Sequence, residues 1–161
     1  MSDLGSQSPF PAAEPAENEY GARPAGGPSG PRAGFWRRFA AMIVDGLVLA
    51  IPSIILVLLI SDGVANILST LIGLVYYSYF EGGATGQTIG KRALGIRVID
   101  FKGGGPIGYP RGLLRYIGRI IAAIPLFLGY FWMIWDKEKQ CWQDKIANTV
   151  VVPIDAYPVN R

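Results

Sequence analysis

Residues 39–60 form an apolar run that is long enough to cross a membrane as one helix. The run contains 22 residues and a single charged side chain, Asp45. At about 1.5 Å per residue, such a helix covers the roughly 30 Å hydrocarbon core of a bilayer. Arg38 precedes Asp45 by seven residues, close to two helical turns, so both are expected on nearly the same face. Because a charge at this depth is costly and normally faces protein or water, Asp45 is the first candidate functional residue.

A second apolar run follows almost at once and predicts an antiparallel partner for the first. Residues 63–80 carry no charge and end in four aromatic residues, Tyr76, Tyr77, Tyr79 and Phe80, which are typical of a membrane interface. Half of all residues are hydrophobic and 17% are charged, which favours a membrane protein over a soluble one. Arg37 and Arg38, just before the first span, predict a cytoplasmic N-terminus. We expect a multi-pass protein of the cell (plasma) membrane.

Residues 81–119 carry a strong positive bias, with seven basic residues against two acidic ones. Such a segment is expected in the cytoplasm. Residues 94–100 alternate in polarity and precede Gly103, Gly104 and Gly105, which predicts a small cytoplasmic β-hairpin completed by Ile107 and Tyr109. Residues 149–152 are also strand-like and could pair with this hairpin if the C-terminus lies inside.

A third apolar segment is too short to settle its own topology. Arg111, Arg115 and Arg119 recur every four residues and predict a cationic amphipathic helix at the lipid headgroups. The apolar run after them, residues 120–135, has only 16 residues and contains Pro125, so it could either cross the membrane or bend and return. The predicted fold is an all-α membrane protein with two transmembrane helices, this third segment, spanning or re-entrant, and the small cytoplasmic β-hairpin.

Composition divides the chain into three parts. Residues 1–34 are rich in Pro, Gly and Ala with almost no aliphatic side chains, which predicts a disordered tail. Residues 35–153 contain the membrane domain, with spans at about 39–60, 63–80 and 116–135, and residues 154–161 are expected to form a C-terminal tail.

The residue inventory argues against most catalytic and metal-binding functions. The chain has no histidine and one cysteine, Cys141, so no histidine-based zinc site, catalytic triad or intramolecular disulfide is expected. Residues 86–92 lack the Ser or Thr that a phosphate-binding loop places after its lysine, because Arg92 follows Lys91. We expect no enzyme activity, cofactor, metal or nucleic-acid partner.

Three blocks in a fixed order carry a more specific signal: Phe35-Trp36-Arg37-Arg38-Phe39-Ala40 with Asp45, then Thr85-Gly86-Gln87-Thr88-Ile89-Gly90-Lys91-Arg92 with Leu94-Gly95-Ile96-Arg97-Val98, and finally Gln140-Cys141-Trp142-Gln143-Asp144-Lys145-Ile146-Ala147-Asn148-Thr149. Together they resemble the RDD family of small, mainly bacterial multi-pass membrane proteins. The resemblance places the residues that name the family, one arginine and two aspartates, on Arg38, Asp45 and Asp144. Many members have His and Gly where this chain has Gln143 and Asn148, and the glutamine argues against proton shuttling there. The resemblance implies transport of unidentified ligands, or cation/proton exchange in some members.

Two functional hypotheses and one structural alternative follow. In the first, Arg38 and Asp45 line a transport path for an ion or small ligand, and a homo-oligomer or membrane protein partner completes it because two spans can hardly enclose a path. In the second, a non-catalytic adaptor binds a protein partner or anionic lipids of the bilayer through basic residues: Lys91, Arg92, Arg97, Arg111, Arg115 and Arg119. In the structural alternative, Asp45 pairs with Arg38, Arg115 or Arg119 and fixes helix packing.

Overall fold

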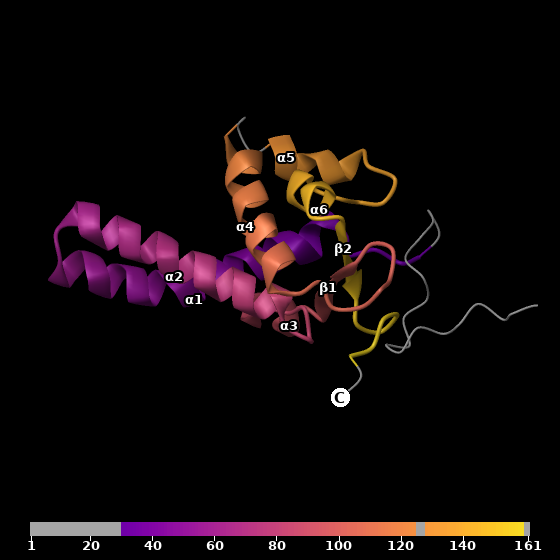
Figure 1. Ribbon diagram of the computed structural model, residues 1–161, viewed down its shortest axis with the longest axis horizontal. Helices are drawn as coiled ribbons and strands as arrows, with labels where there is room; N and C mark the ends of the chain where they lie inside the picture. Colours follow the sequence, from indigo (N-terminus) through magenta and orange to yellow (C-terminus); the bar gives the residue numbers. More distant parts are fainter. Residues whose placement is uncertain (1–29, 125–127, 160–161) are drawn as a thin grey trace, which may run out of the picture.

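The computed structural model describes residues 30–124 and 128–159, and its dominant feature is a long helical hairpin (Figure 1). Helix α1 spans Phe35–Leu59 and helix α2 spans Asp62–Gly82. Both are long and apolar enough to cross a membrane, which confirms a long apolar helix at each of the two predicted spans. Ala41 and Asp45 are the buried residues of α1, so nearly all its apolar side chains point outward. Lipid can cover such a surface, whereas water would make it unfavourable.

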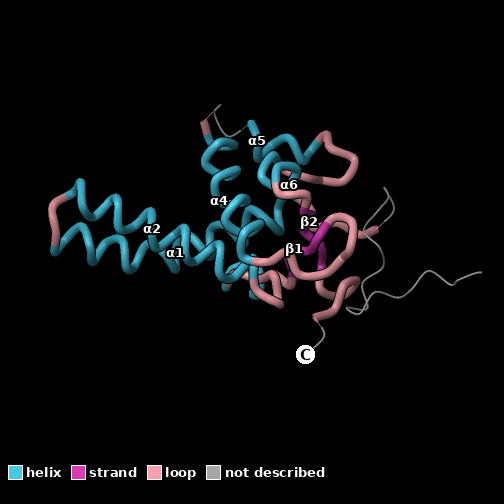
Figure 2. The backbone as a smooth tube through the Cα atoms, viewed as in Figure 1, coloured by secondary structure: helices cyan, strands magenta, loops and turns pink. Residues whose placement is uncertain are grey.

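The remaining elements gather at the end of the hairpin that holds the start of α1 and the end of α2. They are α3 (Ile89–Ala93), β1 (Ile96–Asp100), α4 (Tyr109–Ala123), α5 (Leu128–Phe131), the 3-10 turn η1 (Trp132–Ile134), α6 (Trp142–Ile146) and β2 (Thr149–Pro153). Figure 2 shows how the two strands lie together on the side away from the hairpin tip.

The sheet pairs strands that are far apart in the sequence. Strand β1 runs antiparallel to β2, with Ile96 opposite Pro153 and Asp100 opposite Thr149. The predicted pairing of residues 94–100 with residues 149–152 is therefore confirmed, but the local hairpin ending at Ile107 and Tyr109 is wrong. Gly108 has a φ of 78° and Tyr109 already belongs to α4, so this segment does not continue as a strand. The central residues of β1 are buried, and their side chains belong to two hydrophobic clusters, one that includes Tyr157 and one that includes Ala41 and Ile107.

Helix α4 is amphipathic, but its charged side faces the protein interior and its apolar side faces outward, the reverse of a helix in a soluble protein. Arg115 is 1% exposed and lies inside, together with the small residues Gly112, Gly118 and Ala122. The large apolar side chains of α4 and its end are exposed: Leu113, Leu114, Ile117, Ile120, Ile121 and Ile124. The predicted amphipathic pattern is present, but its cationic side packs against protein. An apolar outer face around a charged interior is typical of a membrane environment.

The third apolar segment is bent. Helix α4 and the α5–η1 segment meet at 113°, which is the geometry of a broken span or a re-entrant loop. A Cβ on Gly129 would collide with Ala122, so the returning segment packs tightly on α4. A single straight span over residues 116–135 is therefore not observed. Pro125, the predicted bend position, lies outside the described residues.

Both ends of the described chain are held by contacts with the rest of the protein. The Ala33 amide donates to the carbonyl of Val151 at 3.0 Å, and the Arg32 guanidinium pairs with Glu138 at 2.7 Å. Tyr157 is buried, and its amide donates to the carbonyl of Pro153 at 3.2 Å. The body thus extends from about residue 30 to residue 158, while residues 1–29 of the predicted tail lie outside the described residues.

Candidate functional site

Asp45 is a buried hydrogen-bond acceptor shared by three segments of the chain. Its Oδ1 accepts from the Tyr76 hydroxyl and the Gly90 amide, both at 2.7 Å, and its Oδ2 accepts from the Thr88 hydroxyl at 2.6 Å. A Cβ on Gly90 would collide with the backbone of Ala41, so only glycine lets α3 approach α1 this closely. Asp45 therefore anchors α2 and α3 to α1.

A separate set of charges forms one ion-pair network, made of Arg38, Glu81, Lys91, Arg115, Arg119 and Asp144. Glu81, at the end of α2, is fully buried and meets three cations. Its oxygens lie 2.6 Å from Lys91, 2.7 Å from Arg115 and 2.7 Å from Arg119. Glu81 thereby joins α2 to α3 and α4.

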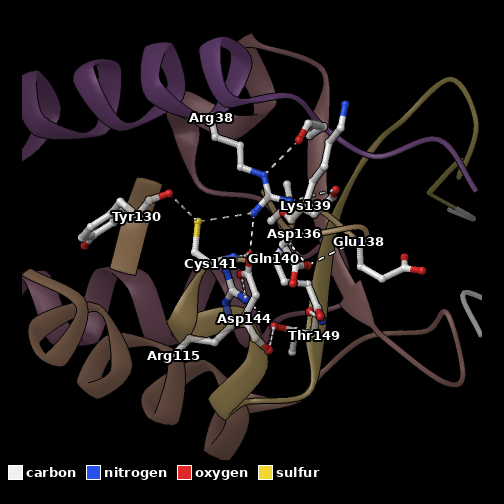
Figure 3. A network of polar contacts seen from close by, with 12 residues as sticks. Arg38, Arg115, Tyr130, Asp136, Glu138, Lys139, Gln140, Cys141, Asp144 and Thr149 are labelled. Atoms are coloured by element: carbon white, nitrogen blue, oxygen red, sulfur yellow. Dashed lines mark hydrogen bonds and ion pairs between the residues drawn. The ribbon is translucent and has the colours of Figure 1, made fainter. Parts of the chain in front are cut away.

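Asp144 is the second carboxylate of the ion-pair network, and Figure 3 shows the polar contacts around it. It lies 2.5 Å from Arg38 and 2.5 Å from Arg115, and it also accepts from the Cys141 amide at 3.0 Å, which caps α6. Arg115 thus bridges Asp144 and Glu81, while the Thr149 hydroxyl contacts the same guanidinium. Asn148, which follows α6, has a φ of 51°, a backbone conformation that glycine adopts most easily and asparagine tolerates.

The three residues that name the family are not arranged as the sequence predicted. Arg38 pairs with Asp144, and the hydrogen bonds to Asp45 come from uncharged donors. Among the described residues, no ion pair joins Asp45 to Arg38, Arg115 or Arg119. Ion pairs between helices are present, as predicted, but Asp144 and Glu81 supply the carboxylates in place of Asp45.

The basic residues predicted to contact lipid or anions divide into two groups. Lys91, Arg97 and Arg115 are buried, and Arg119 is largely enclosed by Glu81 and Tyr77, so the structure does not place these four at headgroups. Arg97 donates to the carbonyl of Pro158 at 2.9 Å instead. By contrast, Arg92 is exposed, and Arg111 is partly exposed beside Asp100 at 2.6 Å.

A cavity of about 330 Å³ lies against the ion-pair network and Asp45. Its wall combines the charged side chains Arg38, Asp45, Lys91, Arg115, Arg119 and Asp144 with Gln143, Cys141 and an apolar surface of Phe35, Phe39, Ala41, Met42, Tyr77, Tyr130, Phe131, Met133 and Val151. The volume is at the lower end of the roughly 300–1,000 Å³ common for ligand pockets. Arg38, Asp45 and Asp144 therefore line one cavity, although only Arg38 and Asp144 contact each other.

The titratable groups around the cavity have pKa values shifted in different directions. Burial lowers the pKa of Lys91 below its usual value, and the attraction of Glu81 offsets this only in part. Burial raises the pKa of Asp144, but Arg115 and Arg38 lower it by more, so the pKa stays below its usual value. Burial and the nearby charge of Asp144 raise the pKa of the Cys141 thiol to about 12, which makes it a weak nucleophile at neutral pH.

Sequence reasoning missed Glu81 and the partners of Asp45. Glu81 follows an apolar run, where an acidic residue is easily taken for the start of a cytoplasmic loop. A usable signal was the shortage of acidic partners for the arginines of residues 81–119, where Glu81 and Asp100 are the only carboxylates. Tyr76 and Thr88 gave no charge signal, and their hydroxyl groups become important only through the fold.

Replacing Asp45 with alanine is expected to destabilise the protein by several kcal/mol. Three donors, from Tyr76, Thr88 and Gly90, would lose their acceptor, and each buried unsatisfied group costs about 1–3 kcal/mol. Thermal unfolding of the purified protein, followed by tryptophan fluorescence, measures the change. Gly46→Ala is the matched control, since no atom lies within 4 Å of the added Cβ. An Asp45→Ala protein as stable as the parent would contradict the anchoring role.

The family comparison covers the network and the cavity together. Residues 32–148 match the model of the RDD family, a range that includes Arg38, Asp45 and Asp144. The chain belongs to the RDD family. This RDD protein is 38% identical over 86 residues to the proline-rich antigen homolog of Mycobacterium tuberculosis, which is 51% of this chain and 35% of that protein.

Two further relatives of this RDD protein differ in how much of their length is matched. The proline-rich antigen of Mycobacterium leprae is 35% identical over 81 residues, covering 50% of this chain and 32% of that protein. The uncharacterized protein YxaI of Bacillus subtilis is 28% identical over 147 residues, covering 74% of this chain and 96% of its own. The chain thus spans about a third of the length of the mycobacterial relatives. No solved structure matches it.

Proposed function

We propose that this RDD protein is a multi-pass, non-catalytic transport protein of the cell membrane that binds an ion or small ligand in the cavity beside α1. The observation that carries the proposal is the cavity itself, because its wall brings together Arg38, Asp45 and Asp144. In a chain with an apolar outer surface, buried charges around a ligand-sized space favour a function for that space. Two long helices do not enclose a path, so we expect a homo-oligomer or a membrane protein partner to complete it.

The positive bias of residues 81–119 supports a cytoplasmic location for the sheet end of the molecule and for the N-terminus. The adaptor hypothesis has less support. It requires a basic surface, whereas Lys91, Arg97 and Arg115 are buried. The cavity is therefore the better basis for a function.

Filling the cavity should block transport. We expect Met42→Trp to reduce flux more than tenfold, because Met42 lines the cavity and the larger indole would occupy it. The purified full chain is reconstituted into liposomes that contain a pH-sensitive dye, and proton flux is measured after addition of NaCl or KCl. Asp45 is less suitable for this test, because its substitution also removes an anchor of α2 and α3.

Leu47→Trp is the matched control, since Leu47 lies on the same helix, is 66% exposed and does not line the cavity. This variant should retain the parent flux. No flux from the parent protein, or equal flux from the Met42→Trp protein, would refute the transport proposal.

A further inference from the structure

The ion-pair network contains more positive than negative charge. Four cations, Arg38, Lys91, Arg115 and Arg119, share two carboxylates, Glu81 and Asp144. All four cations also line the cavity, whereas Glu81 does not. Asp45 adds one negative charge to the cavity wall, but its oxygens already accept three hydrogen bonds. An uncompensated buried charge is costly, so this wall favours an anion.

Several N–H groups of these cations remain available for such an anion. In residues 30–124 and 128–159, Arg119 uses Nη2 for Glu81, and its Nε and Nη1 make no hydrogen bond. Lys91 similarly donates to a single side chain, Glu81, within the described chain. Nη2 of Arg115 has no hydrogen-bond partner there either. Guanidinium and ammonium groups with free donors suit a phosphate or carboxylate oxygen.

A neutral group on the same wall also lacks a partner. Gln143 is 5% exposed, and its buried Oε1 accepts no hydrogen bond from the described residues. Gln143 lines the cavity, so a rotation of its side chain would turn this oxygen toward a hydroxyl on the ligand. The wall therefore offers cationic donors for an oxyanion and, separately, an acceptor for a hydroxyl.

The apolar part of the wall indicates where the ligand enters. Phe39, Met42 and Phe131 line the cavity and are 40%, 43% and 41% exposed, so they mark its mouth. Their neighbours on the outer surface of α1 include Ile43 and Leu47, which are also exposed and apolar. The mouth therefore opens on the surface that we assign to lipid. A ligand that enters here carries an apolar chain.

We propose that the cavity binds the hydroxylated, anionic headgroup of a membrane lipid on Lys91, Arg115 and Arg119, while its chains remain in the bilayer beside Phe39, Met42 and Phe131. The cavity holds a headgroup, whereas the acyl chains exceed its volume. This inference rests on the proposed function only in using the same cavity as the ligand site. Binding is measured separately from flux, so each can fail without the other.

Cys141 provides the measurement, because it is the one cysteine of the chain and it lines the cavity. The purified full chain is placed in phosphatidylcholine nanodiscs with or without phosphatidylglycerol, and the rate of Cys141 modification by methyl methanethiosulfonate is followed by intact mass. Phosphatidylglycerol should slow the reaction several-fold. Diacylglycerol, which has a hydroxyl but no phosphate, should leave the rate unchanged, and so should inorganic phosphate, which has no apolar chain.

Two substitutions separate the cavity from the general surface. Lys91→Met should abolish the protection by phosphatidylglycerol, whereas Arg92→Met, which changes the exposed neighbouring cation, should preserve it. If Lys91→Met does not fold, Met42→Trp gives a second test, because it should slow modification without any added lipid and remove the lipid effect. Native mass spectrometry should show phosphatidylglycerol retained by the parent and by the Arg92→Met protein.

Several results would overturn the inference. These are equal protection by diacylglycerol or by inorganic phosphate, unchanged protection in the Lys91→Met protein, and no phosphatidylglycerol retained by the parent in native mass spectrometry. Protection without flux in the liposome experiment would support the lipid site and refute transport. Flux without protection would do the reverse.

Discussion

Glu81→Gln is expected to be the most destabilising conservative substitution in the protein. It removes the single carboxylate that meets Lys91, Arg115 and Arg119, and it leaves those three cations close together and buried. Breaking a buried ion pair by removing one partner costs about 3–5 kcal/mol, and here one change affects three pairs. We expect the variant to lose most of its folded, monodisperse fraction in size-exclusion chromatography, with any remaining protein unfolding at a much lower temperature.

Two controls distinguish charge imbalance from a general effect of altering α2. Asp62→Asn changes an exposed carboxylate on the same helix and should behave like the parent protein. Lys91→Met removes one of three cations and leaves Glu81 paired with both arginines, so it should be tolerated better and should partly rescue Glu81→Gln in the double variant. A Glu81→Gln protein with parent-like yield and unfolding temperature would show that Glu81 does not hold the ion-pair network together.

The two long helices could be predicted from the sequence because each is encoded by one continuous run of apolar residues. A run of apolar residues long enough for a bilayer needs no knowledge of its partners, and residues 39–60 and 63–80 coincide closely with α1 and α2. The same reasoning identified the arginine spacing on α4. It did not tell which side of α4 faces protein, because in lipid the apolar side points outward and the charged side must find partners inside.

The contacts of the site were less accessible, since they join residues far apart in the chain. Arg38 and Asp144 are 106 positions apart, and only the tertiary fold brings them together. Helical spacing pointed to Arg38 and Asp45 as a local pair instead. Likewise, the glycines after β1 suggested a local hairpin, whereas the strand that pairs with β1 lies at the end of the domain. Local sequence patterns therefore identified several residues and strands of the site but not which of them contact each other.

Asp144→Asn is expected to destabilise the protein at neutral pH by about 3–5 kcal/mol, a shift in unfolding temperature on the order of 10 °C. The substitution leaves Arg38 without its carboxylate partner and Arg115 with Glu81 alone. Arg115 and Arg38 hold the pKa of Asp144 below its ordinary value of 3.8. Its contribution to stability is therefore complete above that value and is lost as the pH falls through the lower pKa of the folded state.

The difference between parent and Asp144→Asn proteins should consequently stay constant from neutral pH down to about pH 4 and shrink only in stronger acid. Thermal unfolding by tryptophan fluorescence at a series of pH values measures this difference, with other titrating groups cancelling between the two proteins. Asp155→Asn, at an exposed position, should show no difference at any pH. A penalty that already declines near pH 6 would mean that the pKa of Asp144 is raised, which would contradict its pairing with both arginines.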